Sequence, residues 1–148
     1  MPLSKKQCIQ LNQAIFSLAN AYRSRMLRDG VVEKTGLTLP HRSTLMVLGQ
    51  TAPTTARDLS SRMDINPGTV SVYVQQLVEK GLAKRAQDET DRRTWWLSLT
   101  DAGQAAYRET VSGAAEYTRD FLRSLSGEEQ GKLHELLLRI AADLGYEW

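Results

Sequence analysis

The chain has little cysteine and no long apolar run, and both shortages narrow where we expect it to work. Cys8 is the one cysteine among 148 residues, so no internal disulfide can form. The longest apolar runs, such as 45–48 and 136–138, are too short to cross a membrane, and no signal-peptide core follows the two lysines near the start. We therefore expect a cytoplasmic protein.

The residue groupings of common enzymes are missing as well. The sequence contains no glycine-rich phosphate loop, no Ser/His/Asp or Cys/His grouping and no paired-carboxylate motif. The two histidines, His41 and His134, are far apart, and no set of cysteines or carboxylates has metal-ligand spacing. We expect a protein that is not an enzyme and holds no metal and no cofactor, with each histidine at the surface or at a helix end.

What the chain does have is the composition of one globular domain, which we place over residues 1–148. A hydrophobic fraction of 41% and a charged fraction of 24% are ordinary for such a domain. The charge is unevenly spread, because residues 1–100 carry a net charge of +6 and residues 101–148 a net charge of −4. This asymmetry suits a polyanionic partner, although a solvated surface without any partner explains it equally well.

Helices with apolar stripes are expected at both ends of the chain. The first covers residues 4–28, with Ser4 as its cap and Gly30 as its stop, and two more cover about 101–125 and 127–144. A single domain cannot cover this much apolar helix surface, so the terminal helices, about 4–28 and 101–146, are expected to form a homodimer. The stripe residues are Cys8, Leu11, Ile15, Leu18, Tyr22, Phe121, Leu125, Leu136, Ile140 and Leu144.

The centre of the chain has residues that start and end helices at the spacing of a helix-turn-helix. A helix runs from Pro40 to about residue 50, and Thr54 or Thr55 can cap the next one. Asn66 and Pro67 then start a helix that ends near residue 81, because an asparagine cap followed by proline favours a helix start. The inner face of this helix carries Val70, Tyr73, Val74 and Leu77, and its outer face carries Gly68, Thr69, Ser71, Val72, Gln75 and Gln76.

A short hairpin follows, with strands expected over residues 82–85 and 94–99. The second strand alternates apolar residues, which predicts that Trp95 lies in the core of the hairpin and Trp96 on its surface. The fold class is therefore mostly α with a small β-hairpin wing, a winged helix-turn-helix over about residues 39–100.

The loop of this hairpin concentrates positive charge. Arg92 and Arg93 are adjacent there, and such a pair suits the narrow minor groove of DNA, where negative potential is concentrated. Asp91 is two residues before Arg93 and is placed to hold its guanidinium in a fixed pose. A solvated charged turn is the alternative explanation of the same residues.

The segment 91–103 resembles the wing signature of the MarR (multiple-antibiotic-resistance regulator) family. That signature has Asp, any residue and Arg, followed by Leu-Thr and Ala-Gly, as this segment does. Residues 36–40 and 78–82 also look like family segments, and the resemblance covers about residues 8–144. It implies a bacterial transcription regulator, expected to be a repressor, that binds palindromic duplex DNA as a homodimer and responds to a small molecule.

The resemblance also implies two arms of DNA contact. The helix over 66–76 enters the major groove, where Ser71 and Gln75 can donate and accept hydrogen bonds, and Arg93 enters the minor groove. Val72 departs from the family, since relatives often carry a basic or polar residue at its position. The candidate DNA-binding residues are Asn66, Pro67, Gly68, Thr69, Ser71, Val72, Gln75, Gln76, Asp91, Arg92 and Arg93.

The sequence also allows an effector site, redox sensing and protein–protein contact. Tyr22, Arg25, His41 and Arg42 are candidates for binding a small aromatic or phenolic effector, although Arg42 stands where many relatives carry an aromatic residue. Redox sensing through Cys8 is an alternative, but its place on the helix stripe favours a small buried apolar residue. A winged helix used for protein–protein contact is a further alternative, which the salt dependence of duplex binding would separate from DNA recognition.

Overall fold

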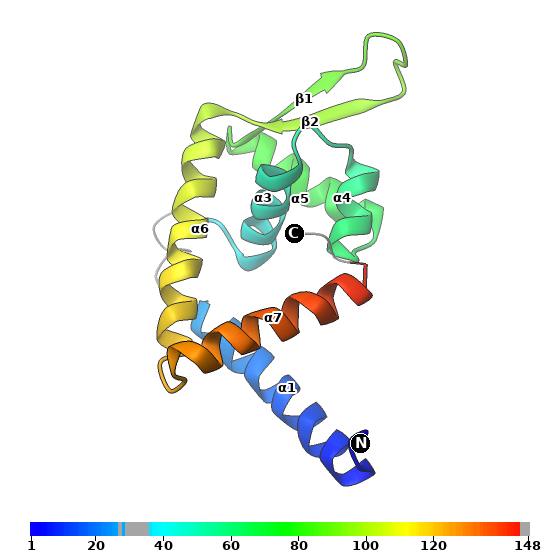
Figure 1. Ribbon diagram of the computed structural model, residues 1–148. Helices are drawn as coiled ribbons and strands as arrows, with labels where there is room; N and C mark the ends of the chain where they lie inside the picture. The colour runs from blue at the N-terminus through cyan, green and yellow to red at the C-terminus, as the bar shows by residue number, and fades with distance from the viewer. Residues whose placement is uncertain (27, 29–35, 146–148) are drawn as a thin grey trace. The chain divides into compact units, whose positions relative to one another are not determined.

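The computed structural model describes residues 1–26, 28 and 36–145 (Figure 1). The chain divides into two compact units, residues 1–39 and residues 40–148. Gly30, expected to stop the first helix, lies outside the described residues. No helix in the described part of the chain is long and apolar enough to span a membrane.

The first unit includes the helix α1 (Lys5–Met26). Ser4 caps it as expected: its Oγ accepts from the amide of Gln7 at 3.3 Å, and the Gln7 Oε1 accepts from the Ser4 amide at 2.9 Å. Cys8 is exposed, so its expected burial is wrong for the single chain. The helix also exposes large apolar side chains, namely Ile9, Leu11, Ile15, Phe16 and Leu18.

The second unit begins with the winged helix-turn-helix. Its elements are α3 (Leu39–Thr51), α4 (Ala56–Met63), α5 (Pro67–Glu79), β1 (Ala83–Gln87) and β2 (Trp95–Leu99), in the expected order. Figure 1 shows the β1–β2 hairpin extending beyond the three helices. Each element contributes to one small apolar core, formed by Leu45, Leu48, Leu59, Val70, Val74, Leu77, Ala83, Leu97 and Leu99. The mostly helical fold with a hairpin wing is confirmed.

The base of the hairpin is tied to the helices, whereas its tip is not. The strands are antiparallel, with Ala83 opposite Leu99 and Gln87 opposite Trp95. Thr54 adds a bridge on the other side of β2, since its amide and carbonyl both pair with Leu97. Trp95 is 48% exposed, so its expected place in the core is wrong. The alternation along β2 is real, but at Trp95 the hairpin has already passed the end of the helical core.

Two further helices complete the second unit: α6 (Asp101–Phe121) and α7 (Gly127–Asp143). The α6 helix ends four residues earlier than the expected residue 125. The Gln130 side chain donates to the carbonyl oxygens of Leu122 and Leu125, which gives these groups partners outside a continued helix. The Ser126–Glu129 capping box that starts α7 is present as expected.

The junction between wing and α6 is tightly packed. The Thr100 hydroxyl donates to the Gly81 carbonyl at 2.6 Å and accepts from the Gly103 amide at 3.0 Å. A Cβ at Gly103 would overlap the carbonyl oxygen of Leu82, so only glycine fits there. One hydroxyl thus joins the chain after α5, the end of β2 and the first turn of α6.

Candidate nucleic-acid interface

The turn between α4 and α5 sets the direction of the second helix. Thr55 caps α4, and Asp64 ends it in the left-handed conformation at φ 50°, which an aspartate tolerates better than most residues. The Ser60 hydroxyl donates to the Ile65 carbonyl at 2.6 Å, which satisfies a backbone group inside the turn. The connection is therefore short and held by hydrogen bonds at both ends.

The start of α5 is formed as the sequence predicts. Asn66 Oδ1 accepts from the Gly68 amide at 2.8 Å, and Pro67 occupies the first turn. Val70, Val74 and Leu77 are buried beneath it. Among the candidates on this helix, Pro67, Gly68, Ser71, Val72 and Gln75 are exposed with Asn66, while Thr69 and Gln76 are half-buried.

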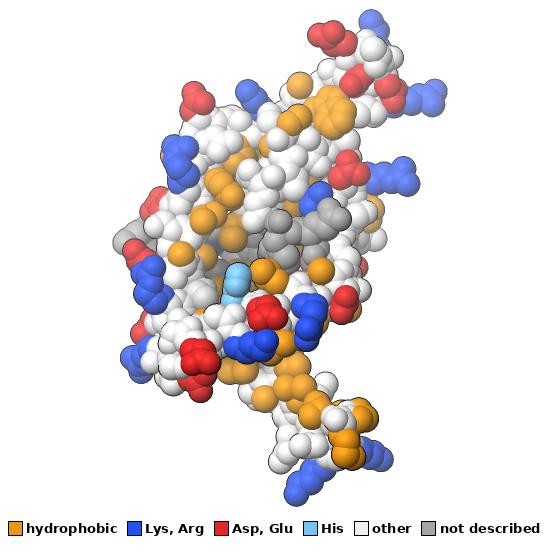
Figure 2. Space-filling model, in the orientation of Figure 1, with side chains coloured by type: hydrophobic (Ala, Val, Ile, Leu, Met, Phe, Trp, Pro, Cys, Tyr) orange, Lys and Arg blue, Asp and Glu red, His pale blue; other side chains and the backbone are white. Residues whose placement is uncertain are grey.

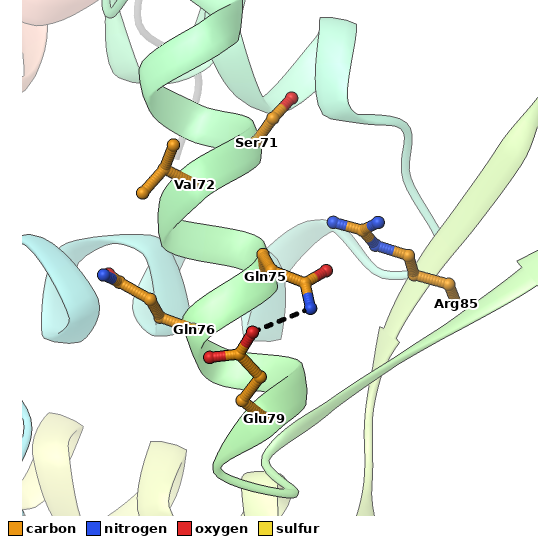
Figure 3. A pocket seen from close by; sticks show the side chains of 6 residues that line it. All are labelled: Ser71, Val72, Gln75, Gln76, Glu79 and Arg85. Atoms are coloured by element: carbon orange, nitrogen blue, oxygen red, sulfur yellow. Dashed lines mark hydrogen bonds between the residues drawn. The ribbon is translucent and has the colours of Figure 1, made fainter.

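The outer face of α5 and the wing share one shallow depression of about 450 Å³. Figure 3 shows the side chains that line it: Ser71, Val72, Gln75, Gln76 and Glu79 come from α5, and Arg85 reaches across from β1. An uncharged hydrogen-bonding surface is thus flanked by one acidic and one basic side chain. Val72 is 53% exposed and contributes an apolar contact surface of the kind that meets a thymine methyl group.

Both glutamines on this face are held by neighbouring side chains. Gln75 Nε2 donates to Glu79 Oε1 at 3.0 Å, one helical turn further along (Figure 3). Gln76 Oε1 lies 2.7 Å from Nε2 of His41 on α3. His41 is 8% exposed and its ring meets the ring of Tyr73 edge-on, with centroids 6.3 Å apart. His41 is at a helix end as expected, in the first turn of α3, but it is buried because that turn packs against α5.

The wing loop is organised by Asp88. One of its carboxylate oxygens accepts from the Thr90 amide, the Thr90 hydroxyl and the Asp91 amide at 2.7–2.9 Å. The other accepts from the indole N–H of Trp96 at 2.7 Å. These donors lower the pKa of the Asp88 carboxyl well below its ordinary value, with the Trp96 contact contributing most. The Asp88 carboxylate thus joins the backbone of the loop to the side chain of Trp96 on β2.

Asp91 supports the same loop, but through the backbone of Arg93. Its carboxylate accepts from the Arg93 amide at 3.0 Å and from the Thr94 hydroxyl at 2.9 Å. Within residues 36–145, no ion pair joins it to the Arg93 guanidinium, so the side-chain pairing expected from the spacing is not seen. Gln87 Nε2 also donates to the Arg92 carbonyl at 2.6 Å.

Arg92 and Arg93 are both exposed, and the backbone of each makes a hydrogen bond within the loop, the Arg92 carbonyl with Gln87 and the Arg93 amide with Asp91. Figure 2 shows charged side chains of both signs gathered at the tip of the hairpin. The two arginines are therefore available to a polyanion without first breaking an ion pair with Asp91.

The four effector candidates differ in exposure. In the first unit, Tyr22 is half-buried and Arg25 is exposed. In the second unit, His41 and Arg42 are both buried, and Arg42 is only 2% exposed. The described residues include no group of three or more histidine, cysteine or acidic side chains arranged to hold a metal ion.

Several residues of this surface were missed by sequence reasoning. Glu79 lies one turn after Gln75, a spacing that could have revealed the pair. Asp88 is followed two residues later by Thr90, a pattern typical of turns in which aspartate accepts from the backbone. Arg85 and the contact of His41 with Gln76 had no local signal, because both depend on how elements pack.

Comparisons with known proteins find the MarR family and HTH-type transcriptional regulators. The model of the MarR family matches residues 35–94. The HTH-type transcriptional regulator MgrA of Staphylococcus aureus is 30% identical over 130 residues, covering 86% of this chain and 87% of that protein. The HTH-type transcriptional repressor MdtR of Bacillus subtilis is 27% identical over 110 residues, covering 74% and 71%.

Solved structures show the same fold. A probable transcriptional regulator from Pseudomonas aeruginosa is 29% identical and superposes with a TM-score of 0.74, covering 88% of this chain and 96% of that one. A MarR family protein from Bacillus stearothermophilus, 19% identical, superposes with a TM-score of 0.83 over 97% of this chain and 99% of that one, and so shows the same fold.

Proposed function

The chain belongs to the MarR family of DNA-binding transcription regulators, which are not enzymes, and on that premise we propose that it represses transcription as a homodimer on a palindromic operator. The observation that carries the proposal is the surface shared by α5 and the wing. It presents hydrogen-bonding side chains for base edges beside exposed arginines for phosphate or the minor groove. A cytoplasmic location follows from such a role.

The DNA-binding residues of the proposal act in two arms. Asn66, Pro67, Gly68, Thr69, Ser71, Val72, Gln75 and Gln76 belong to the major-groove arm, and Asp91, Arg92 and Arg93 belong to the wing arm. The exposed start of α5 supports the first arm, since small residues there let the backbone approach base edges. The repressor role is supported by the name of the relative MdtR.

The experiment is duplex binding at several salt concentrations. A chain that neutralises phosphates must lose affinity steeply as salt rises, because counterions are released on binding. Selection from a random duplex library should enrich a palindrome, with half-sites about one helical turn apart. Binding that does not depend on salt, with no sequence enriched, would replace the proposal with a role in protein–protein contact.

The homodimer is supported by apolar side chains that the single chain leaves in solvent. On α1 these include Ile15, Phe16 and Leu18, and on α7 they include Leu137 and Ile140 (Figure 2 shows apolar side chains along α1). Exposed apolar surface of this extent on helices is typical of protein–protein interfaces. We therefore place the dimer contacts on the helices within 4–28 and 101–146.

Leu18→Asp tests the dimer. We expect this variant to sediment as a monomer at micromolar concentration and to lose operator binding, because a charge would be buried without a partner. Ser17→Asp is the matched control, since it adds the same charge on a side of α1 that carries none of the exposed large apolar side chains, and it should remain dimeric. A parent protein that sediments as a monomer would refute the dimer.

An effector is also part of the proposal, and a small aromatic acid such as salicylate is the first candidate. Each unit carries one guanidinium group that suits a carboxylate and one aromatic ring: Arg25 and Tyr22 in the first unit, Arg42 and His41 in the second. Such a ligand changes DNA binding only if its affinity for the free and DNA-bound states differs. Calorimetry with salicylate at millimolar concentration should show binding, and its absence would remove the effector without affecting the DNA-binding proposal.

A further inference from the structure

The adjacent glutamines on α5 differ from glutamines on an ordinary exposed helix face. A carboxamide carries one acceptor oxygen and one donor NH₂, and a free glutamine can turn to present either or both. In the major groove a free glutamine reads adenine with both groups at once, accepting from N6 and donating to N7. Gln75 and Gln76 do not have this freedom, because each is already bonded to a neighbouring side chain.

One of the two N–H donors of Gln75 is occupied by Glu79, which fixes the direction of the carboxamide. An ionised carboxylate only accepts, so the contact of 3.0 Å with Glu79 Oε1 must be made by the NH₂ group of Gln75. The amide oxygen is then left on the side away from Glu79, facing the depression and Arg85 (Figure 3). Gln75 therefore presents an acceptor.

Gln76 is bonded through its oxygen, whereas Gln75 is bonded through its NH₂ group. An amide oxygen also only accepts, so the contact of 2.7 Å with His41 requires the proton on Nε2 of the imidazole. His41 is almost fully buried and its ring lies against Tyr73, so it holds this oxygen from a fixed position. The NH₂ group of Gln76 is left for other partners, and Gln76 therefore presents a donor.

We propose that Glu79 and His41 are specificity-determining positioning residues, which polarise Gln75 and Gln76 in opposite senses before DNA arrives. Gln75 then accepts from a base amino group, adenine N6 or cytosine N4. Gln76 donates to a base acceptor, guanine O6 or N7 or thymine O4. The inference rests on the proposed function, in which α5 lies in the major groove.

This arrangement also bears on affinity. Two glutamine side chains that are ordered in the free protein lose less conformational entropy on binding than two free ones. The cost is a negative charge at Glu79 near the phosphates, which Arg85 at the same depression offsets. Removal of Glu79 should therefore raise affinity for all duplexes. It should also weaken the preference for one particular base at a single position of the operator.

Glu79→Ala tests whether Glu79 orients Gln75. Affinity is measured for every single base-pair change in a half-site selected from a random duplex library. At one position, the parental preference should fall about 5- to 10-fold, the scale of one hydrogen bond. Gln75→Ala should lose preference at that same position, and the double variant should lose no more than either single one.

Glu89→Ala is the matched control. Glu89 is an exposed wing-loop acid whose side chain makes no hydrogen bond within the described part of the chain. Its removal should raise affinity for all duplexes with no change in base preference. A Glu79→Ala variant whose base preferences match those of this control would overturn the role of Glu79.

The role of His41 is tested first on the unmodified protein. The tautomer of His41 can be read from long-range ¹H–¹⁵N correlations, and we expect the proton on Nε2. A proton on Nδ1 alone would overturn the role of His41. His41→Phe, which keeps a ring beside Tyr73, should shift preference at a second, adjacent position towards adenine, while Tyr73→Phe should leave it unchanged.

The outcomes separate this inference from the proposed function. If no sequence is enriched and duplex binding does not depend on salt, both are overturned. If an operator is enriched and bound but neither Glu79→Ala nor His41→Phe changes any base preference, the proposed function holds and this inference alone is wrong.

Discussion

The outer face of α5 and the wing loop hold their side chains in place by different means. On α5 the helix backbone sets every position, and side-chain contacts such as Gln75 with Glu79 only refine the orientation of end groups. In the wing loop no repeating backbone pattern exists, and the Asp88 and Asp91 carboxylates replace it by accepting from amides and hydroxyls. A change on α5 should therefore alter one contact, whereas a change at Asp88 should alter the whole loop.

The largest effect is expected from Arg93→Ala, which removes a cation from each wing of a dimer. Loss of an arginine contact costs about 1–3 kcal/mol, and two wings act together. The slope of log affinity against log salt should shrink by about 2, because one phosphate-facing charge is lost per wing. Fluorescence anisotropy with the selected duplex measures both quantities. Arg108→Ala, on α6, is the control and should change neither.

Asp88→Asn should come next, because it disturbs the loop without removing an arginine. An asparagine oxygen accepts more weakly than a carboxylate, so the Trp96 indole and the Thr90 and Asp91 amides lose their strongest acceptor. Affinity should fall for operator and random duplexes alike, and by less than for Arg93→Ala. Hydrogen exchange at the amides of Thr90 and Asp91 should accelerate. A loop that keeps its protection would show that Asp88 does not organise it.

Gln75→Ala should have a smaller effect on affinity and a different signature. It removes one hydrogen-bonding group and no charge, so the salt slope should stay as in the parent. Discrimination between operator and random duplex should fall by about 5- to 10-fold per half-site, as expected for one hydrogen bond. A change in salt slope for this variant would mean that the two arms do not divide their roles as proposed.

The smallest effect is on stability at low pH. The pKa of Asp88 is lower in the folded chain than its ordinary value of 3.8, so the unfolded chain binds more protons below that pH. The Asp88 contribution to stability is therefore fully present above about pH 5 and is lost as pH falls below 3.8 towards the folded pKa. Thermal unfolding of the parent and Asp88→Asn should differ at pH 7, and the difference should shrink steadily as pH is lowered below 3.8. A constant difference would contradict the assignment.

Local signals explain which parts could be predicted from sequence. Asn66 with Pro67, and Ser126 with Glu129, act within one helical turn, so the starts of α5 and α7 are found without knowledge of the fold. Trp95 shows the limit of a periodic pattern. Its alternation with Leu97 predicts a strand face, but burial depends on how far the helices extend beneath that strand.

The interface contacts that could not be predicted from the sequence are tertiary contacts. His41 meets Gln76 across 35 residues of sequence, and Arg85 meets the outer face of α5 only because β1 turns back along it. Asp91 was correctly placed in the wing, but its spacing from Arg93 allowed a side-chain or a backbone contact, and the backbone contact forms. Spacing along the chain does not decide between partners that lie equally near.

The Thr100 hydroxyl also has a mechanical consequence. Because it bonds to the Gly81 carbonyl and the Gly103 amide, and Gly103 leaves no room for a Cβ, the corner between the wing and α6 cannot bend easily. The 21 residues of α6 span roughly 30 Å, so this helix acts as a lever arm attached to a stiff joint. A rotation of the winged part by a few degrees therefore displaces the far end of α6 by ångströms. A force applied at that far end should therefore turn the winged part as one body.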